Sequence, residues 1–245
     1  SPDSSDILGK EDSARRSKNP SDMSVDDLLK MIGRRHNFRQ VEMAVDAARD
    51  AGFGNVSLDL IYGLPSQSAE DWSKTLTRIL ALKPEHISCY GLKLEPGTPM
   101  YSYKDSPILP SDDEQADMYL YAVETLENAN YAQYEISNFA LHGYESRHNL
   151  KYWRLDEYMG FGASAHSFVG DLRYSYVADM QGYIDGVLGR SGEAQLLDEH
   201  EECTPQSLAA EYVMLGLRTV RGISEQEYRA IYLSDFDEME QLLQQ

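Results

Sequence analysis

Apolar residues recur along the first half of the chain with two different periods, which predict alternating helices and strands. The spacing i, i+3, i+4, i+7 across residues 41–48 is that of an amphipathic helix, and Gly52 is a typical helix end. A shorter apolar segment at 28–32 predicts a helix before it. Residues 55–62 and 86–94 interleave apolar and polar side chains over short runs, which predicts two strands.

Two further helices are marked by their first turns. Ser68 with Asp71, and Ser111 with Glu114, have the spacing of a capping box. The predicted order is therefore helix, strand, helix, strand, helix, and the connection between the strands is long enough for a right-handed crossover. This order predicts a parallel α/β sheet or barrel. Two parallel strands are too few for a stable sheet, so the pattern indicates part of a larger barrel whose earlier strands are missing.

The pattern changes after residue 130. Residues 133–139 are strand-like, residues 147–154 are rich in His, Asn, Tyr and Trp, and residues 160–167 form a loop of small residues. Thr204-Pro205 predicts the start of a helix that runs to about Gly216. We therefore expect four segments: a disordered tail at 1–22, the later part of a barrel at 23–130, a linking region at 131–203 and a helical or winged-helix domain at 204–245.

Composition narrows the classes of partner. The 245 residues contain 22 Lys and Arg against 41 Asp and Glu, a formal net charge of −19. A surface this acidic repels phosphate backbones and anionic lipids. We therefore expect no nucleic-acid or membrane-surface partner. No apolar run is long enough for a membrane span, and two widely separated cysteines indicate no disulfide framework. The expected compartment is the cytoplasm.

Asp59 is a charged residue in an otherwise apolar predicted strand. Because strand side chains alternate, Ser57, Asp59 and Ile61 share one face, whereas Leu58 and Leu60 share the other. The face that meets the helices of a barrel is apolar, so Asp59 is expected inside, near the mouth where ligands bind. A carboxylate there needs a partner. Both a ligand group and a structural ion pair with an arginine would satisfy it, so a binding role and a structural role stay open.

A second group of candidate side chains consists of His148, Asn149, Tyr152 and Trp153. Imidazole can coordinate haem iron, and flat aromatic rings can stack on a macrocycle. The same residues would also suit a packed corner of the surface, so the residues alone leave both interpretations open.

Two other features are weaker candidates for a functional site. The glycines of Gly160-Phe-Gly162-Ala-Ser-Ala165 have the spacing of a dinucleotide fingerprint, but no buried strand precedes them and no amphipathic helix follows. A tight loop with close backbone approach is expected instead. Cys89 lies within a predicted strand and Cys203 is remote from it, so the cysteines of one chain cannot ligate an iron–sulfur cluster.

Several longer stretches occur together in this order: Gly33-Arg34-Arg35-His36, Ser57 to Pro65, Glu95 to Pro99, Tyr134 to Phe139, Arg147 to Trp153 and Gly160 to Ser167. Together they resemble the radical SAM haem chaperone family HemW, whose relatives include oxygen-independent coproporphyrinogen III oxidase, HemN. The resemblance runs from about Val25 to the end of the sequence.

The resemblance implies an α/β fold, a partial TIM-like barrel of radical SAM type that is truncated to its later strands here. A HemN-type C-terminal domain would follow it. The resemblance also implies that Arg34 and Asp59 correspond to residues that help bind S-adenosylmethionine. A guanidinium that meets a carboxylate, and a carboxylate that meets hydroxyls or an amine, are sensible pairings for that ligand.

The stretch that begins at His148 resembles a haem-binding motif of the chaperone branch that the oxidase branch lacks. The resemblance implies that His148 is a candidate haem-iron ligand, with Asn149, Tyr152 and Trp153 as neighbouring haem-binding positions. In this family the cofactors of the full-length protein are S-adenosylmethionine and a 4Fe–4S cluster, and the partners are haem and a client protein that accepts it.

The sequence departs from the family pattern in one region. The Cys-x-x-x-Cys-x-x-Cys loop, the glycine-rich stretch and the first four strands of the family are absent from it. Without three thiolates this chain alone cannot hold the cluster that supplies the electron for cleaving S-adenosylmethionine. Whether it is an enzyme therefore stays open.

Three functions are consistent with these features. The first is a haem chaperone, the second is an enzyme like coproporphyrinogen III oxidase, and the third is a non-catalytic remnant that only binds partners. The motif at His148 favours the first. An incomplete barrel also exposes a strand edge and part of its core, so we expect the chain to self-associate or to be only marginally stable.

Overall fold

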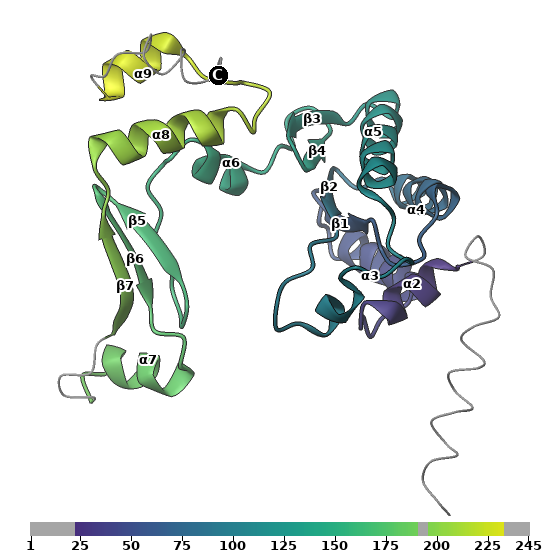
Figure 1. Cartoon of the computed structure of the whole chain (residues 1–245), viewed down its shortest axis with the longest axis horizontal. Helices are drawn as coiled ribbons and strands as arrows, with labels where there is room; N and C mark the ends of the chain where they lie inside the picture. Colours follow the sequence, from purple (N-terminus) through teal and green to yellow (C-terminus); the bar gives the residue numbers. More distant parts are fainter. Residues whose placement is uncertain (1–22, 191–195, 233–245) are drawn as a thin grey trace, which may run out of the picture. The chain divides into compact units, whose positions relative to one another are not determined.

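The computed structural model describes residues 23–190 and 196–232, so the expected tail at 1–22 lies outside the described residues. The chain forms two compact units, Ser1–Glu145 and Ser146–Gln245. Figure 1 shows both units. The division falls after Glu145, so the strand-like segment beyond residue 131 packs within the first unit.

The first unit alternates helices and strands as the apolar pattern predicts. Its elements are α2 (Val25–Met31), α3 (Phe38–Asp50), β1 (Ser57–Tyr62), α4 (Ala69–Ala81), β2 (His86–Gly91), the 3₁₀ helix η2 (Pro99–Tyr103), α5 (Asp112–Asn128), β3 (Ala132–Glu135) and β4 (Asn138–Ala140). Both predicted capping boxes form, at Ser68 before α4 and at Ser111 before α5. Strand β2 is shorter than predicted because it ends at Gly91.

The four strands form one sheet in the order β1-β2-β4-β3. Strands β1 and β2 are parallel, as predicted, with Asp59 beside Ser88, and β4 runs antiparallel to β2. The prediction of a single strand at 133–139 is wrong. The chain turns at Ile136-Ser137 and forms the hairpin β3–β4 instead. The Glu135 carboxylate accepts hydrogen bonds from the Ser137 amide, at 3.0 Å, and from the Asn138 side chain. Such local side-chain bonds compete with a continuous ladder and favour the turn.

The core of this unit lies between the sheet and helices α4 and α5. It includes Leu60 and Ile87 of the parallel strands, and Trp72, whose indole N–H donates to the Met118 carbonyl at 2.8 Å. Leu58 packs against the same cluster, so the Leu58 and Leu60 face of β1 meets the helices. Asp59 is exposed on the opposite face, which confirms the predicted alternation.

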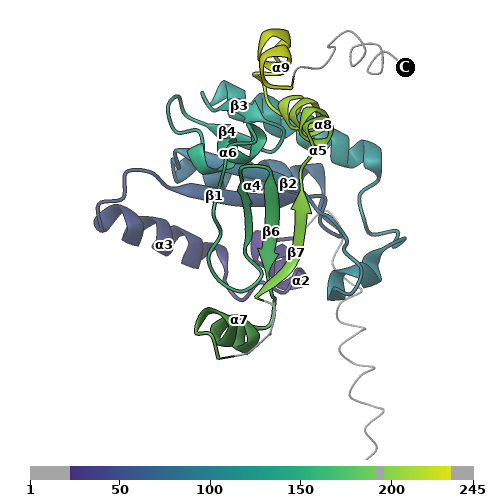
Figure 2. The same cartoon turned by 90° about the vertical axis from the view of Figure 1, so that its left-hand side faces the viewer.

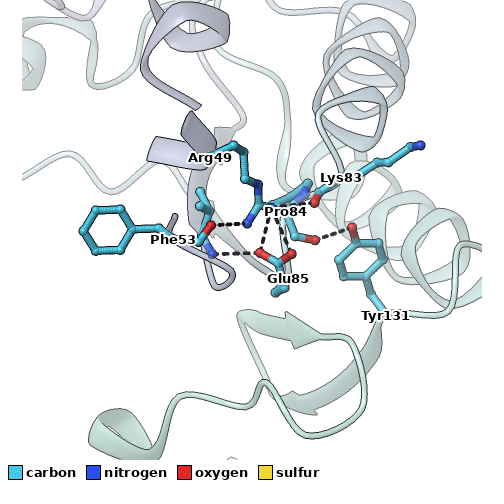
Figure 3. Close-up of polar contacts among 7 residues, drawn as sticks. Arg49, Phe53, Lys83, Pro84, Glu85 and Tyr131 are labelled. Atoms are coloured by element: carbon cyan, nitrogen blue, oxygen red, sulfur yellow. Dashed lines mark hydrogen bonds and ion pairs between the residues drawn. The ribbon is translucent and has the colours of Figure 1, made fainter. Parts of the chain in front are cut away.

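A polar network ties the amino ends of β1 and β2 to the end of α3 (Figure 3). The Arg49 guanidinium donates to both oxygens of Glu85, at 2.9 and 2.8 Å, and to the carbonyls of Phe53 and Lys83, each at 3.0 Å. Glu85 also accepts the Val56 amide at 2.8 Å. Burial alone would raise the pKa of Glu85, but the hydrogen bonds from Arg49 and Val56 lower it overall. This arrangement fixes the start of the parallel pair.

The second unit is built on an antiparallel sheet. Its elements are α6 (Arg147–Trp153), β5 (His166–Val169), β6 (Leu172–Tyr176), α7 (Met180–Val187), β7 (Leu197–Glu202), α8 (Pro205–Gly216) and α9 (Glu225–Tyr232). The strand order is β5-β6-β7, and helices α7 and α8 lie at opposite ends of this sheet in Figures 1 and 2. The predicted helix from Thr204-Pro205 to Gly216 is confirmed as α8. The three strands were not predicted.

An ion pair and a small apolar cluster hold the second unit together. Arg173 of β6 binds both carboxylate oxygens of Glu211 on α8, at 3.0 and 2.7 Å. Its guanidinium also lies 5.3 Å from the centre of the buried Phe168 ring of β5. Helices α8 and α9 meet at the cluster of Ala209, Val213 and Tyr228. Within the part of the chain described, no helix has both the length and the apolar character to cross a bilayer.

Candidate functional site

A cavity of about 320 Å³ lies along β1, beside α2 and the segment that follows it. Most of its walls are apolar, with Leu29, Ile32 and Leu64 among the lining residues. Arg34 and Asp59, the two positions predicted for S-adenosylmethionine, both line it. The fold therefore brings this cation and this carboxylate to one cavity.

The end of α2 directs Arg34 towards that cavity. Gly33 has a φ of +74°, a left-handed conformation that glycine adopts without strain, and the Arg34 amide donates to the Leu29 carbonyl at 2.9 Å. The Phe38 amide at the start of α3 donates to the Asp26 carboxylate of α2 at 2.8 Å. Both ends of the segment that carries Arg34 are thus fixed by hydrogen bonds.

Beside Asp59, on the same face of the sheet, lies a buried histidine that sequence reasoning missed. His86 is 5% exposed, and its two ring nitrogens lie 2.7 Å from the Ser57 hydroxyl and 2.7 Å from the Tyr134 hydroxyl. Burial lowers the pKa of His86, and the Asp59 carboxylate partly opposes this. Its position at the start of a strand, in phase with Ser57, was the available signal.

The second candidate site is on α6. His148 and Tyr152 lie one helical turn apart, with the Tyr152 hydroxyl 3.2 Å from His148 Nε2 and the ring centres 5.1 Å apart, edge to face. His148 is exposed and Tyr152 is half-buried. The imidazole is therefore at the surface, supported on one side by an aromatic ring.

Asn149 and Trp153 lie elsewhere on this helix. The Asn149 amide donates to Ser146 Oγ at 3.3 Å, a contact that caps α6. The Trp153 ring lies 4.6 Å below the guanidinium of Arg218, and its buried Nε1 has no hydrogen-bond partner within the described residues. The structure thus joins His148 to Tyr152 by a contact but shows no such contact between His148 and Trp153.

Tyr158 extends the aromatic group and was also missed from the sequence. Its ring centre lies 4.7 Å from that of Tyr152, edge to face. Its backbone exchanges two hydrogen bonds with Phe168 of β5, both at 2.9 Å. The segment after α6 turns back on the helix, where the Asp156 amide donates to the Lys151 carbonyl at 2.9 Å, and the pairing with Phe168 fixes the Tyr158 backbone to β5. Because Tyr158 lies beyond the helix, helical spacing gave no signal for it.

The small-residue loop is a tight structural turn, as expected. A Cβ atom at Gly160 would collide with the backbone oxygen of His166, and Gly162 has a φ of +110°. The two cysteines are buried, and burial raises the pKa of the Cys89 thiol to about 12. Across residues 23–190 and 196–232, no three metal-binding side chains of His, Cys, Asp or Glu gather into a site. A cluster that needs three thiolates does not fit a chain with two.

Known proteins with similar sequences are heme chaperones. The chain is 38% identical over 214 residues to the heme chaperone HemW of Bacillus subtilis, a match that covers 86% of this chain and 56% of that protein. It is 34% identical over 214 residues to the heme chaperone HemW of Lactococcus lactis, covering 86% and 55%. The chain is thus similar to HemW proteins over most of its own length. It spans about half the length of these HemW proteins. No protein-family profile matches it.

The fold has a solved counterpart. Coproporphyrinogen III oxidase, HemN, from Escherichia coli, described as a radical SAM enzyme, matches 87% of this chain and 52% of its own, with a TM-score of 0.72 and 20% identity. The expected α/β fold, matching about half of this solved fold, is therefore confirmed.

Proposed function

We propose that this chain forms the haem-binding part of a HemW-type haem chaperone, which binds haem and passes it to a client protein. One observation carries the proposal. In a chain 38% identical to a heme chaperone, His148 presents an exposed imidazole on α6 beside the Tyr152 ring. An imidazole with an aromatic neighbour suits haem as cargo, because the nitrogen can bind iron and the ring can contact the macrocycle.

The charge of α6 supports this proposal. Arg147, Lys151 and Arg154 are exposed on this short segment, although the chain as a whole carries a net charge of −19. Haem carries two anionic propionates, which would gain from local cations in an otherwise acidic protein. In this arrangement His148 binds the iron, Tyr152 contacts the porphyrin edge, and the basic side chains hold the propionates. Asn149 and Trp153 would then act by fixing α6.

A haem titration followed by absorbance tests the proposal. The Soret band of the wild-type chain should shift and saturate at one haem per chain. His148→Ala should lose the shift, whereas His142→Ala, which removes another exposed histidine, should keep it. A folded wild-type chain that shows no shift would contradict the proposal and favour a non-catalytic remnant that only binds partners.

We also propose that the cavity at β1 receives S-adenosylmethionine. The residues fit that molecule, because Arg34 can bind its carboxylate and Asp59 can bind hydroxyls or an amine, while the apolar walls can contact the adenine. When bound with a reduced 4Fe–4S cluster, the molecule supplies a 5′-deoxyadenosyl radical. This chain has too few cysteines for such a cluster, so its own residues are proposed only to bind and orient the ligand.

Calorimetric titration with S-adenosylmethionine tests this second site. Asp59→Asn and Arg34→Met should each weaken binding about tenfold or more, the range expected for loss of a charged hydrogen bond. Asp50→Asn, an exposed carboxylate at the end of α3, should have no effect. Equal affinity in wild type and Asp59→Asn would exclude Asp59 from the site.

Self-association is proposed from the position of β1. It is the outer strand of its sheet, so one row of its backbone groups has no neighbouring strand within the described residues. Such an edge can pair with another chain. Sedimentation velocity over a range of concentrations should show species larger than a monomer, and a monomer at all concentrations would contradict this. The proposed place of action is the cytoplasm, in keeping with the two free cysteines.

A further inference from the structure

The contact between His148 and Tyr152 occupies the atom that would bind iron. The Tyr152 hydroxyl lies 3.2 Å from His148 Nε2. If Nε2 carries no proton, the hydroxyl donates to its lone pair. If Nε2 carries the proton, the nitrogen donates to the hydroxyl and has no lone pair to offer. In either tautomer Nε2 is engaged, and an electrophile or a metal must break this hydrogen bond to reach it.

Tyr158 supports this contact, because its ring packs against that of Tyr152. Tyr152 lies between two rings, with the His148 ring centre at 5.1 Å and the Tyr158 ring centre at 4.7 Å, both edge to face. The Tyr158 backbone is fixed to β5 by its two hydrogen bonds with Phe168, whose side chain is buried. The position of Tyr152 is therefore set by the sheet and not by α6 alone.

We propose that Tyr152 is a reversible cap on His148 Nε2, and that Tyr158 is the positioning residue that holds this cap closed in the haem-free chain. This inference rests on the proposed haem function and adds its regulation. In the tautomer that carries its proton on Nδ1, the Tyr152 hydroxyl releases Nε2 on loading and the bond between Nε2 and iron forms, so no proton leaves the imidazole. On release the iron bond breaks and Tyr152 closes again on Nε2. The cap thereby slows loading and assists transfer to a client.

Chemical labelling of the full chain tests the cap without haem. Diethyl pyrocarbonate acylates imidazole nitrogens, and mass spectrometry gives the labelling rate of each histidine. The exposed His142 and His200 serve as references within the same molecule. Tyr152→Phe keeps the ring but removes the hydroxyl, so the rate at His148 relative to the references should rise about two- to tenfold, as expected for loss of one hydrogen bond. An unchanged ratio would overturn the cap.

A pair of variants at Tyr158 tests the positioning role. Tyr158→Leu removes the ring that supports Tyr152 and should raise labelling of His148, though less than Tyr152→Phe does. Tyr158→Phe retains the ring and should restore the wild-type rate. A wild-type rate in Tyr158→Leu would overturn the role of Tyr158. Unchanged rates at the exposed His142 and His200 would show that the reagent acts equally in each sample, and an unchanged circular dichroism spectrum would show that the variants remain folded.

Haem kinetics separate the cap from the proposed function. If the chain binds haem, stopped-flow absorbance should show faster loading and slower release in Tyr152→Phe, with haem affinity about two- to tenfold higher. Haem kinetics in Tyr152→Phe identical to wild type would overturn the cap as a control on haem. A chain that binds no haem contradicts the proposed function, whereas the labelling ratio still decides whether Tyr152 caps His148.

Discussion

The two units hold their candidate residues in different ways. In the first, Arg34 and Asp59 come from different elements and line one cavity, next to a core that packs β1 against the helices. In the second, His148 and Tyr152 meet through the spacing of one short helix, in a unit whose small apolar cluster lies between α8 and α9. The site of the first unit should therefore depend strongly on core packing, whereas the contact on α6 should depend mainly on local neighbours.

The largest effect on stability is expected when the core of the first unit is disrupted. Leu76 of α4 is fully buried, so Leu76→Ala should lower the free energy of unfolding of this unit by about 2–5 kcal/mol. Urea unfolding read peptide by peptide, with pulsed hydrogen exchange and mass spectrometry, measures each unit separately. Leu120→Ala on α5, where the side chain is 61% exposed, is the matched control and should change stability by less than about 0.5 kcal/mol. Equal effects of the two variants would refute the dependence on core packing.

A smaller effect is expected when the ion pair of the second unit is broken. Arg173→Met removes both hydrogen bonds to Glu211 and leaves that carboxylate half-buried, which should lower the stability of the unit by about 1–3 kcal/mol. The Glu211 carboxylate raises the pKa of Arg173, so the pair stays charged at neutral pH. The same peptide-resolved urea unfolding should show the loss in β6 and α8. Unchanged midpoints there would mean that the apolar cluster alone stabilises the unit.

The corresponding pair in the first unit should matter less, because a large core supports the same elements. Arg49→Met removes the bidentate contact with Glu85 and should cost about 1–2 kcal/mol, while Glu85 keeps its bond from the Val56 amide. Lys74→Met breaks the exposed pair with Glu70 on α4 and should cost less than about 0.5 kcal/mol. A larger loss in Arg49→Met than in Arg173→Met would reverse the comparison between the units.

How much the sequence predicts also differs between the units. The capping residues Ser68 and Ser111 and the alternation around Asp59 are local signals, and the structure agrees with them. Strand β7 of the second unit gives no such signal, since it reads Leu-Asp-Glu-His-Glu-Glu and is an edge strand with no apolar alternation. Its place comes from pairing with β6, a contact across the chain.

The candidate residues follow the same rule. The contact of His148 with Tyr152 follows from helical spacing once α6 is known, but Tyr158 lies beyond the helix and its backbone is fixed by the bridge to Phe168. Arg34 and Asp59 were found by resemblance, and their shared cavity required the packing of α2 beside β1. The sequence therefore reveals the chemistry of the candidate residues, but it does not reveal which elements pack together to place them.

The smallest effect is expected from the buried His86. It should make the stability of the first unit, but not that of the second, depend on pH. Its pKa is lowered from the ordinary 6.5, mainly by burial, so in the folded chain it binds a proton less readily than in the unfolded chain. Stability should therefore be fully present above about pH 6.5 and should fall as the pH drops towards the lowered pKa, because the unfolded state then binds more protons. His86→Gln removes the titrating ring but can still hydrogen-bond to Ser57 or Tyr134, so its first unit should lose this slope between about pH 6.5 and pH 5. Urea midpoints at several pH values measure the slope, with peptides of the second unit as the reference within each sample. A slope that persists in His86→Gln would assign the pH dependence to another group, such as the Glu85 carboxylate, whose pKa is lowered.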